Sequence, residues 1–111
     1  MTTPTVICFG ELLIDMIATH PGNLTHADGF VKKFGGAPAN TACGLAKLDI
    51  PVAFMGKVGN DPFGHFLKDT LEQNHVNTNQ LITSMHLPTT LAFVSLTQSG
   101  ERDLGNSKPA W

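Results

Sequence analysis

The stretch that most constrains the fold is Phe34-Gly35-Gly36-Ala37-Pro38-Ala39-Asn40-Thr41-Ala42, in which two glycines separate a strand-like segment from a helix-like one. Residues 30–34, Phe-Val-Lys-Lys-Phe, combine polar and apolar side chains in a strand-like pattern, and small residues follow Pro38 at positions 39, 42, 43 and 46. Proline is favoured in the first helical turn because its missing N–H has no partner there. The stretch therefore predicts a helix over about residues 38–48, with the glycines in the turn before it.

The same turn is suited to binding a ligand. Glycine allows a positive φ and lets a ligand approach the main chain closely. The unpaired N–H groups of the first helical turn suit an anion or a hydroxyl-rich ligand. The spacing equally allows a tight turn in which small residues pack the helix against a sheet, and the residues alone leave both interpretations open.

Composition and charge exclude several classes of protein. The 111 residues fit one domain, and the net charge of −2 comes without a basic stripe, which argues against nucleic acid as a partner. The most apolar stretch, residues 6–18, is interrupted by Glu11 and Asp15 and is too short to span a bilayer. The first five residues lack the basic region of a secretory signal. We therefore expect a soluble cytoplasmic protein that binds neither nucleic acid nor membrane.

Cysteine and histidine positions predict neither a disulfide nor a metal site. Cys8 lies in an apolar strand-like run and Cys43 in the expected helix, as is typical of buried reduced thiols. The five histidines are far apart and show no ligand spacing. Surface positions are the simpler interpretation for all five.

The order of elements predicts an α/β sheet. Val6 to Gly10 is a short apolar run that indicates a strand buried on both faces. Glu11 to Phe34 resembles an inserted β-hairpin with turn signals between residues 20 and 29. Further elements are expected as a strand at 52–58, a helix at 62–74, a strand starting at 81–83 and a strand at 89–97. Alternating strands and helices imply a parallel sheet with right-handed crossovers.

Two local sequence signals predict where a helix begins and where a hairpin turn lies. Asp61 followed by Pro62 is the pattern of a helix N-cap and first helical residue. Gln98 to Glu101 is a hairpin turn that should lead into a return strand, yet residues 103–111 read as a loop. An open sheet edge at this point would be an aggregation liability, so the sequence looks cut short.

Five motifs in order resemble the ribokinase-like PfkB family of sugar kinases, and most closely its fructokinase branch. They lie between Val6 and Arg102, and comprise residues 10–15 (Gly-Glu-Leu-Leu-Ile-Asp), 35–42, 56–64 (Gly-Lys-Val-Gly-Asn-Asp-Pro-Phe-Gly), 90–94 and 100–102. One departure is Asp49, where the family usually has Gly or Ser at the helix end. Aspartate tolerates the left-handed conformation, so the expected cost is small.

The resemblance implies the N-terminal part of a ribokinase-like fold of the α/β class, with a parallel sheet flanked by helices and a small β-sheet lid. The whole chain, 1–111, would be the N-terminal part of a PfkB-type carbohydrate kinase domain. The lid would comprise residues 11–34 and 89–103, and the α/β core residues 5–10 and 35–88. A homodimer through the lid is a further possibility that the family suggests.

The resemblance also implies a set of sugar-binding residues. Asp15 would accept hydrogen bonds from sugar hydroxyls, Gly35 and Gly36 would offer main-chain N–H groups, and Asn40 would both donate and accept. Phe93 would pack on the sugar from the lid. The plain alternatives are a solvated carboxylate at Asp15 and an amide that satisfies backbone groups at Asn40.

The implied function is ATP-dependent phosphorylation of a sugar hydroxyl, with Mg²⁺ as the accompanying ion. The family's Gly-Ala-Gly-Asp motif, which carries the catalytic aspartate, and most of the ATP site lie in a second half that this sequence does not contain. Val58-Gly59-Asn60-Asp61 resembles that motif, but we interpret Asp61 as a helix cap. We therefore expect no catalytic residue in this chain and no activity from it alone.

Two other functions remain to be weighed. A truncated, non-catalytic sugar-binding or partner-binding remnant would share the same motifs. A dinucleotide-binding module is disfavoured because no Gly-x-Gly-x-x-Gly follows the first strand. The motifs leave the sugar open: fructose is the best guess, and 2-keto-3-deoxygluconate, ribose or a nucleoside are alternatives.

Overall fold

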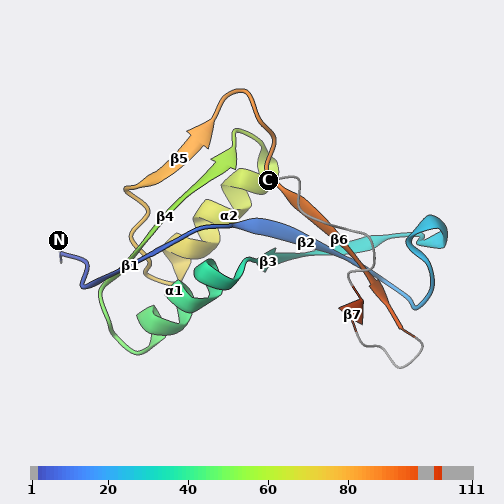
Figure 1. Ribbon diagram of the computed structural model, residues 1–111, viewed down its shortest axis with the longest axis horizontal. Coiled ribbons are helices and arrows are strands. Elements are labelled where there is room, and N and C mark those ends of the chain that lie inside the picture. Colours follow the sequence, from blue (N-terminus) through green and yellow to red (C-terminus); the bar gives the residue numbers. More distant parts are fainter. Residues whose placement is uncertain (1–2, 98–101, 104–111) are drawn as a thin grey trace.

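Two β-sheets, joined end to end, organise the chain (Figure 1). The computed structural model describes residues 3–97 and 102–103. The three-stranded sheet contains β1 (Val6–Phe9), β4 (Val52–Gly59) and β5 (Leu81–Ser84) in the order β1-β4-β5, and both pairings are parallel. The four-stranded sheet has the order β3-β2-β6-β7.

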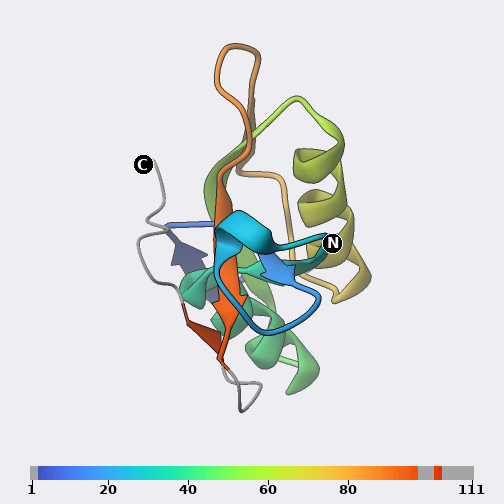
Figure 2. The ribbon, with the colours of Figure 1, turned by 90° about the vertical axis from the view of Figure 1, so that its right-hand side faces the viewer.

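Both α-helices pack on the same face of the three-stranded sheet. Helix α1 (Ala37–Lys47) leads into β4, and α2 (Pro62–Gln73) leads toward β5. Two right-handed crossovers that progress in the same direction across a sheet place their helices on one face, and Figure 2 shows both helices on one side of the strands. The core lies between the helices and this face, and its largest fully buried side chains include Phe54, Leu67 and Leu71.

The opposite face of the three-stranded sheet is uncovered, which contradicts the prediction of strands buried on both faces. Ile7 is 58% exposed, Phe9 74% and Met55 40%. These side chains alternate with Val6, Cys8 and Phe54, which face the helices. The apolar run at β1 correctly predicted a parallel strand, but within the described residues only one of its faces has a covering layer.

The four-stranded sheet is built on a hairpin. Strand β2 (Leu13–Ala18) pairs antiparallel with β3 (Phe30–Gly35), and the connection between them contains the short 3-10 helix η1 (Leu24–His26). Strand β6 (Leu91–Leu96) pairs parallel with β2 on its other side, and β7 (Arg102–Asp103) pairs antiparallel with β6. A parallel sheet with helices and a separate mixed sheet confirm the predicted α/β class.

Element ends follow the local chemistry that the sequence indicates. Helix α1 begins one residue before its predicted start, with Pro38 in the first turn, and Asp49 adopts a φ of 63° just after its end. Asp61 caps α2, as predicted. Gly35 belongs to β3 rather than to the turn, because it pairs with Leu13. The predicted hairpin turn at 98–101 and residues 104–111 lie outside the described residues.

The structure also bears on the state of the two cysteines and on whether a helix could cross a membrane. Cys8 and Cys43 are free, as predicted, and both are half-buried. No helix in the described part of the chain combines the length and apolar character needed to cross a membrane.

Candidate functional site

Asp15 and Gly35 come together across the β2–β3 pair. Leu13 pairs with Gly35 and Asp15 with Lys33, so Leu13, Asp15 and Gly35 lie on one face of the four-stranded sheet. A Cβ atom added to Gly35 would lie 2.7 Å from Asp15 Oδ2 and 2.9 Å from Leu13 Cδ1. Because the glycine has no side chain, the half-buried carboxylate lies directly beside the main chain that leads into α1.

At Gly36 the main chain runs close to the main chain of the segment between β1 and β2. It is the N-cap of α1 with a φ of 110°, a conformation that side-chain-bearing residues rarely adopt. A Cβ atom here would lie 2.5 Å from the carbonyl oxygen of Glu11 and 3.3 Å from Leu12 Cα. Glycine is therefore required both by the backbone conformation and by the neighbouring segment between β1 and β2.

Asn40 lies one turn into α1, on the end of the helix that faces this junction. Its backbone N–H donates to the carbonyl of Gly36 at 3.0 Å. Its side chain is exposed, and no residue in the described part of the chain hydrogen-bonds to the amide. The amide is therefore not used to satisfy nearby backbone groups, which was the plain alternative.

The structure does not bring Phe93 to the same face. Asp15 pairs with Ala92 and Met16 with Phe93, so the aromatic ring projects from the side of the sheet opposite to Asp15. There it contacts Phe30 edge to face, with ring centroids 5.2 Å apart. Ala92 and Val94, both buried, lie on the Asp15 side instead. The sequence shows that 89–97 is a strand, but the side on which each residue falls depends on its register with β2.

A cavity of about 250 Å³ lies where the two sheets meet, and it adds residues that sequence reasoning missed. It is lined by Gly10, Glu11, Leu12, Lys57 and Thr90. A second cavity of about 140 Å³ shares Lys57 and Thr90. Open α/β sheets bind ligands outside the carboxyl ends of their strands, and Gly10 and Lys57 lie at those ends of β1 and β4. That position along the strands was the signal in the sequence that could have indicated Glu11 and Lys57.

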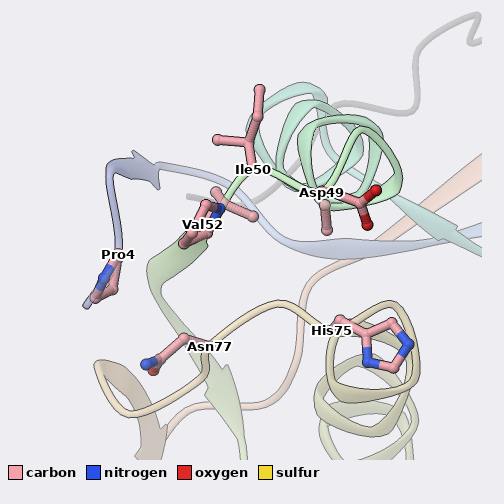
Figure 3. A pocket seen from close by; sticks show the side chains of 8 residues that line it. Pro4, Asp49, Ile50, Val52, His75 and Asn77 are labelled. Atoms are coloured by element: carbon pink, nitrogen blue, oxygen red, sulfur yellow. The ribbon is translucent and has the colours of Figure 1, made fainter. Parts of the chain in front are cut away.

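Another cavity, of about 270 Å³, lies at the opposite edge of the three-stranded sheet (Figure 3). Most of its lining residues come from the start of β4 and from the segments that follow the two helices, and they include Asp49, Val52, His75 and Asn77. This is the amino end of the parallel strands, so the cavity is separate from Asp15 and Gly36.

Asp61 is committed to the backbone, as the helix-cap interpretation predicted. Its carboxylate accepts hydrogen bonds from the N–H of Gly64 at 2.7 Å and from Thr89. Burial opposes ionisation of the carboxyl, but the hydrogen bonds from Thr89 and Gly64 and the nearby His65 outweigh it and lower the pKa of Asp61 below its ordinary value. The Asp61 carboxylate thus caps α2 and bonds to Thr89 in its ionised form.

In residues 3–97, no group of three or more His, Cys, Asp or Glu side chains is arranged to hold a metal ion. The polar groups near this turn are Asp15, the backbone at Gly35 and Gly36, and Asn40 in the first part of α1, while Glu11 and Lys57 line the cavity. This set suits a hydroxyl-rich ligand.

The model of the pfkB family carbohydrate kinases matches residues 3–110. The chain belongs to this family. Fructokinase-2 of Zea mays is 50% identical over 99 residues, which are 88% of this chain and 30% of that protein. The chain thus spans about a third of the length of the curated relatives it matches.

Solved structures of family members have the same fold. The fructokinase of Halothermothrix orenii superposes with a TM-score of 0.80 at 33% identity, over 88% of this chain and 35% of that chain. A fructokinase of Vibrio cholerae, solved in a fructose-, ADP- and calcium-bound form, gives a TM-score of 0.70 at 36% identity, over 82% of this chain and 28% of that chain. The predicted family and its ribokinase-like fold are both confirmed.

Proposed function

We propose that this chain supplies the sugar-binding part of an ATP-dependent sugar kinase, with fructose as the sugar. The observation that carries the proposal is the placement of the Asp15 carboxylate against Gly35, directly before the positive-φ residue Gly36 that opens α1. The fructokinases among the relatives favour fructose over the other sugars that the motifs leave open.

Each residue has a distinct role in the proposed site. The Asp15 carboxylate accepts hydrogen bonds from two neighbouring hydroxyls, and charge-assisted bonds of this kind are the stronger class. Gly35 and Gly36 let the sugar approach the main chain, and Asn40 both donates and accepts. Ala92 and Val94 replace Phe93 as the apolar neighbours of Asp15 on β6, because they share its face.

ATP is the proposed phosphoryl donor, with Mg²⁺ as its ion. The support is the family, together with the ADP and calcium bound by the Vibrio cholerae fructokinase. The described residues of this chain take no part in that chemistry: they bind and orient the sugar. The four-stranded sheet, within residues 11–34 and 89–103, acts as a lid on the α/β core of residues 5–10 and 35–88. Dimerisation through this lid and a cytoplasmic location complete the proposal.

The test is a chimera in which this chain replaces the matching 99-residue stretch of Zea mays fructokinase-2. A coupled ADP-release assay with ATP and magnesium measures turnover on fructose, ribose and 2-keto-3-deoxygluconate. We expect fructose-dependent turnover. A chimera that unfolds cooperatively, binds fructose in calorimetry and yet releases no ADP would favour the non-catalytic remnant. A folded chimera that turns over another sugar and not fructose would show the substrate to be wrong.

A further inference from the structure

A compact hydrogen-bond cluster joins the start of α2 to the strand that enters the four-stranded sheet. Asp61 Oδ1 accepts from the hydroxyl of Thr89 at 2.6 Å, and Asp61 Oδ2 accepts from the backbone N–H of Thr89 at 2.9 Å. The hydroxyl oxygen of Thr89 in turn accepts from the N–H of Gly59 at 3.0 Å. We call Asp61 and Thr89 the latch.

Asp61 accepts more hydrogen bonds than a helix cap requires. An N-cap needs one acceptor for an N–H in the first helical turn, and Gly64 supplies that donor here at 2.7 Å. The bonds with Thr89 reach across 28 positions of sequence and leave Thr89 only 5% exposed. They fix the loop from β5 to β6 where it passes the N-terminal end of α2 (Figure 1).

Two glycines make room for this cluster. A Cβ atom on Gly59 would lie 2.6 Å from Asp61 Oδ2 and 2.6 Å from the backbone nitrogen of Thr89. A Cβ atom on Gly64 would collide with the carbonyl oxygen of Gly59. The spacing Gly59-x-Asp61-x-x-Gly64 therefore serves close packing around the latch rather than contact with a ligand.

The residue after the latch connects directly to the candidate site. The carbonyl of Thr90 accepts from the N–H of Ile14 at 3.0 Å, which begins the pairing of β6 with β2. Two residues farther on, Ala92 pairs with Asp15. Thr90 also lines both of the cavities that Lys57 lines. The position of Thr89 therefore sets where β6, and with it the face that carries Asp15, lies over the core.

The other two crossings between the sheets pass through glycines at positive φ. The chain passes from β1 to β2 through Gly10, with a φ of 139°, and from β3 to α1 through Gly36, with a φ of 110°. Glycines at positive φ are the positions where a backbone can change direction at least steric cost. The loop from β5 to β6 is held by side-chain hydrogen bonds at the latch.

We propose that Asp61 and Thr89 are positioning residues, which hold the four-stranded sheet at a fixed pivot so that Asp15 is aligned with the sugar. The part concerning sugar rests on the proposed function, whereas the pivot itself does not. The ordinary alternative is that the pair only stabilises α2, and in that case its loss would affect the core and the four-stranded sheet alike.

The pivot is tested by hydrogen exchange, followed by mass spectrometry, on this chain. Thr89→Val keeps the shape and removes the hydroxyl, and we expect amides of β2 and β6 to exchange about tenfold faster. Amides of β1 and β4 should change less than about twofold, apart from Gly59, whose N–H loses its acceptor on Thr89. Thr89→Ser restores the hydroxyl and should behave as the parent. Val76→Ala removes buried apolar contacts from the core and should speed exchange there instead. Equal acceleration throughout, or none, would overturn the pivot.

The sugar alignment is tested in the chimera described above. We expect Thr89→Val to raise the KM for fructose about tenfold with little change in the KM for ATP, and Thr89→Ser to restore it. Val76→Ala should lower the melting temperature without this difference between the KM for fructose and the KM for ATP. An unchanged KM for fructose would overturn the alignment role. If the parent chimera shows no fructose turnover, the proposed function fails, and the exchange experiment still decides the pivot.

Discussion

At the scale of single residues, the candidate site depends on the absence of a side chain at two glycines. Gly35 leaves space for the Asp15 carboxylate, and Gly36 leaves space for the backbone at Glu11. The sequence alone predicted that these positions matter, because adjacent glycines before a proline-led helix are rarely exchangeable. It could not tell which neighbour each glycine accommodates, since Asp15 lies 20 positions before Gly35 and Glu11 lies 25 positions before Gly36.

Substitution of Gly36 should cost more than backbone strain. In Gly36→Ala the positive φ and the collision with the Glu11 carbonyl act together, whereas Gly22→Ala meets a φ of 133° with nothing within 4 Å. We expect Gly22→Ala to destabilise the chain by about 1–2 kcal/mol and Gly36→Ala by clearly more. Thermal unfolding of the two variants measures this difference. Equal losses would mean that the segment at Glu11 moves aside freely.

At the scale of elements, local signals set the boundaries and long-range pairing sets the faces. Helix α2 was predicted to within one residue because Asp61, Pro62 and the apolar spacing all act within its own sequence. Phe93 was assigned to the site from the resemblance, yet its side of the sheet is decided by the pairing of β6 with β2. A shift of one residue reverses the face of every side chain in a strand, so no pattern within β6 could settle it.

The cap of α2 predicts a pH dependence of stability. The pKa of Asp61 is lower in the folded state than its ordinary value. Its contribution to the free energy of unfolding is therefore fully present at a pH above the ordinary pKa, and it is lost as the pH falls through the folded-state pKa. We therefore expect the parent to be more stable than Asp61→Asn near neutral pH, and the difference to shrink below about pH 4. Chemical denaturation over a pH series measures it.

A matched control for that series is Asp69→Asn, which changes an exposed carboxylate on the same helix. If the gap between the parent and Asp61→Asn were constant from neutral to acid pH, the Asp61 charge would not contribute, and shape alone would explain the cap.

At the scale of the whole molecule, the uncovered face of the three-stranded sheet is the main departure from the sequence expectation. Parallel sheets are normally covered on both faces. Here both crossovers carry their helices to the same side, and Ile7, Phe9, Met55 and Ile82 are left exposed on the other. A strand sequence can show that both of its faces are apolar, but it does not show which parts of a chain cover them.

This face should make the chain self-associate in solution. Contiguous exposed apolar patches promote association, and we expect the double variant Phe9→Lys and Ile82→Lys to associate more weakly than the parent, because only the contact through this face is lost. Leu48→Lys changes an isolated exposed leucine just beyond α1 and should leave association unchanged. Sedimentation velocity over a concentration series distinguishes these outcomes. A parent chain that stays monomeric at every concentration would contradict the prediction.

The central claim is that Asp15 binds sugar hydroxyls beside the two glycines, and the most direct measurement is kcat/KM for fructose in the chimera with Asp15→Asn. The substitution keeps the shape and removes the charge. Each hydrogen bond to a charged group contributes about 1.5–3 kcal/mol, so we expect a roughly ten- to hundredfold loss with little change in melting temperature. Asp28→Asn, an exposed carboxylate in the turn between β2 and β3, should leave kcat/KM unchanged. An Asp15→Asn chimera with the parent's kcat/KM would contradict the account.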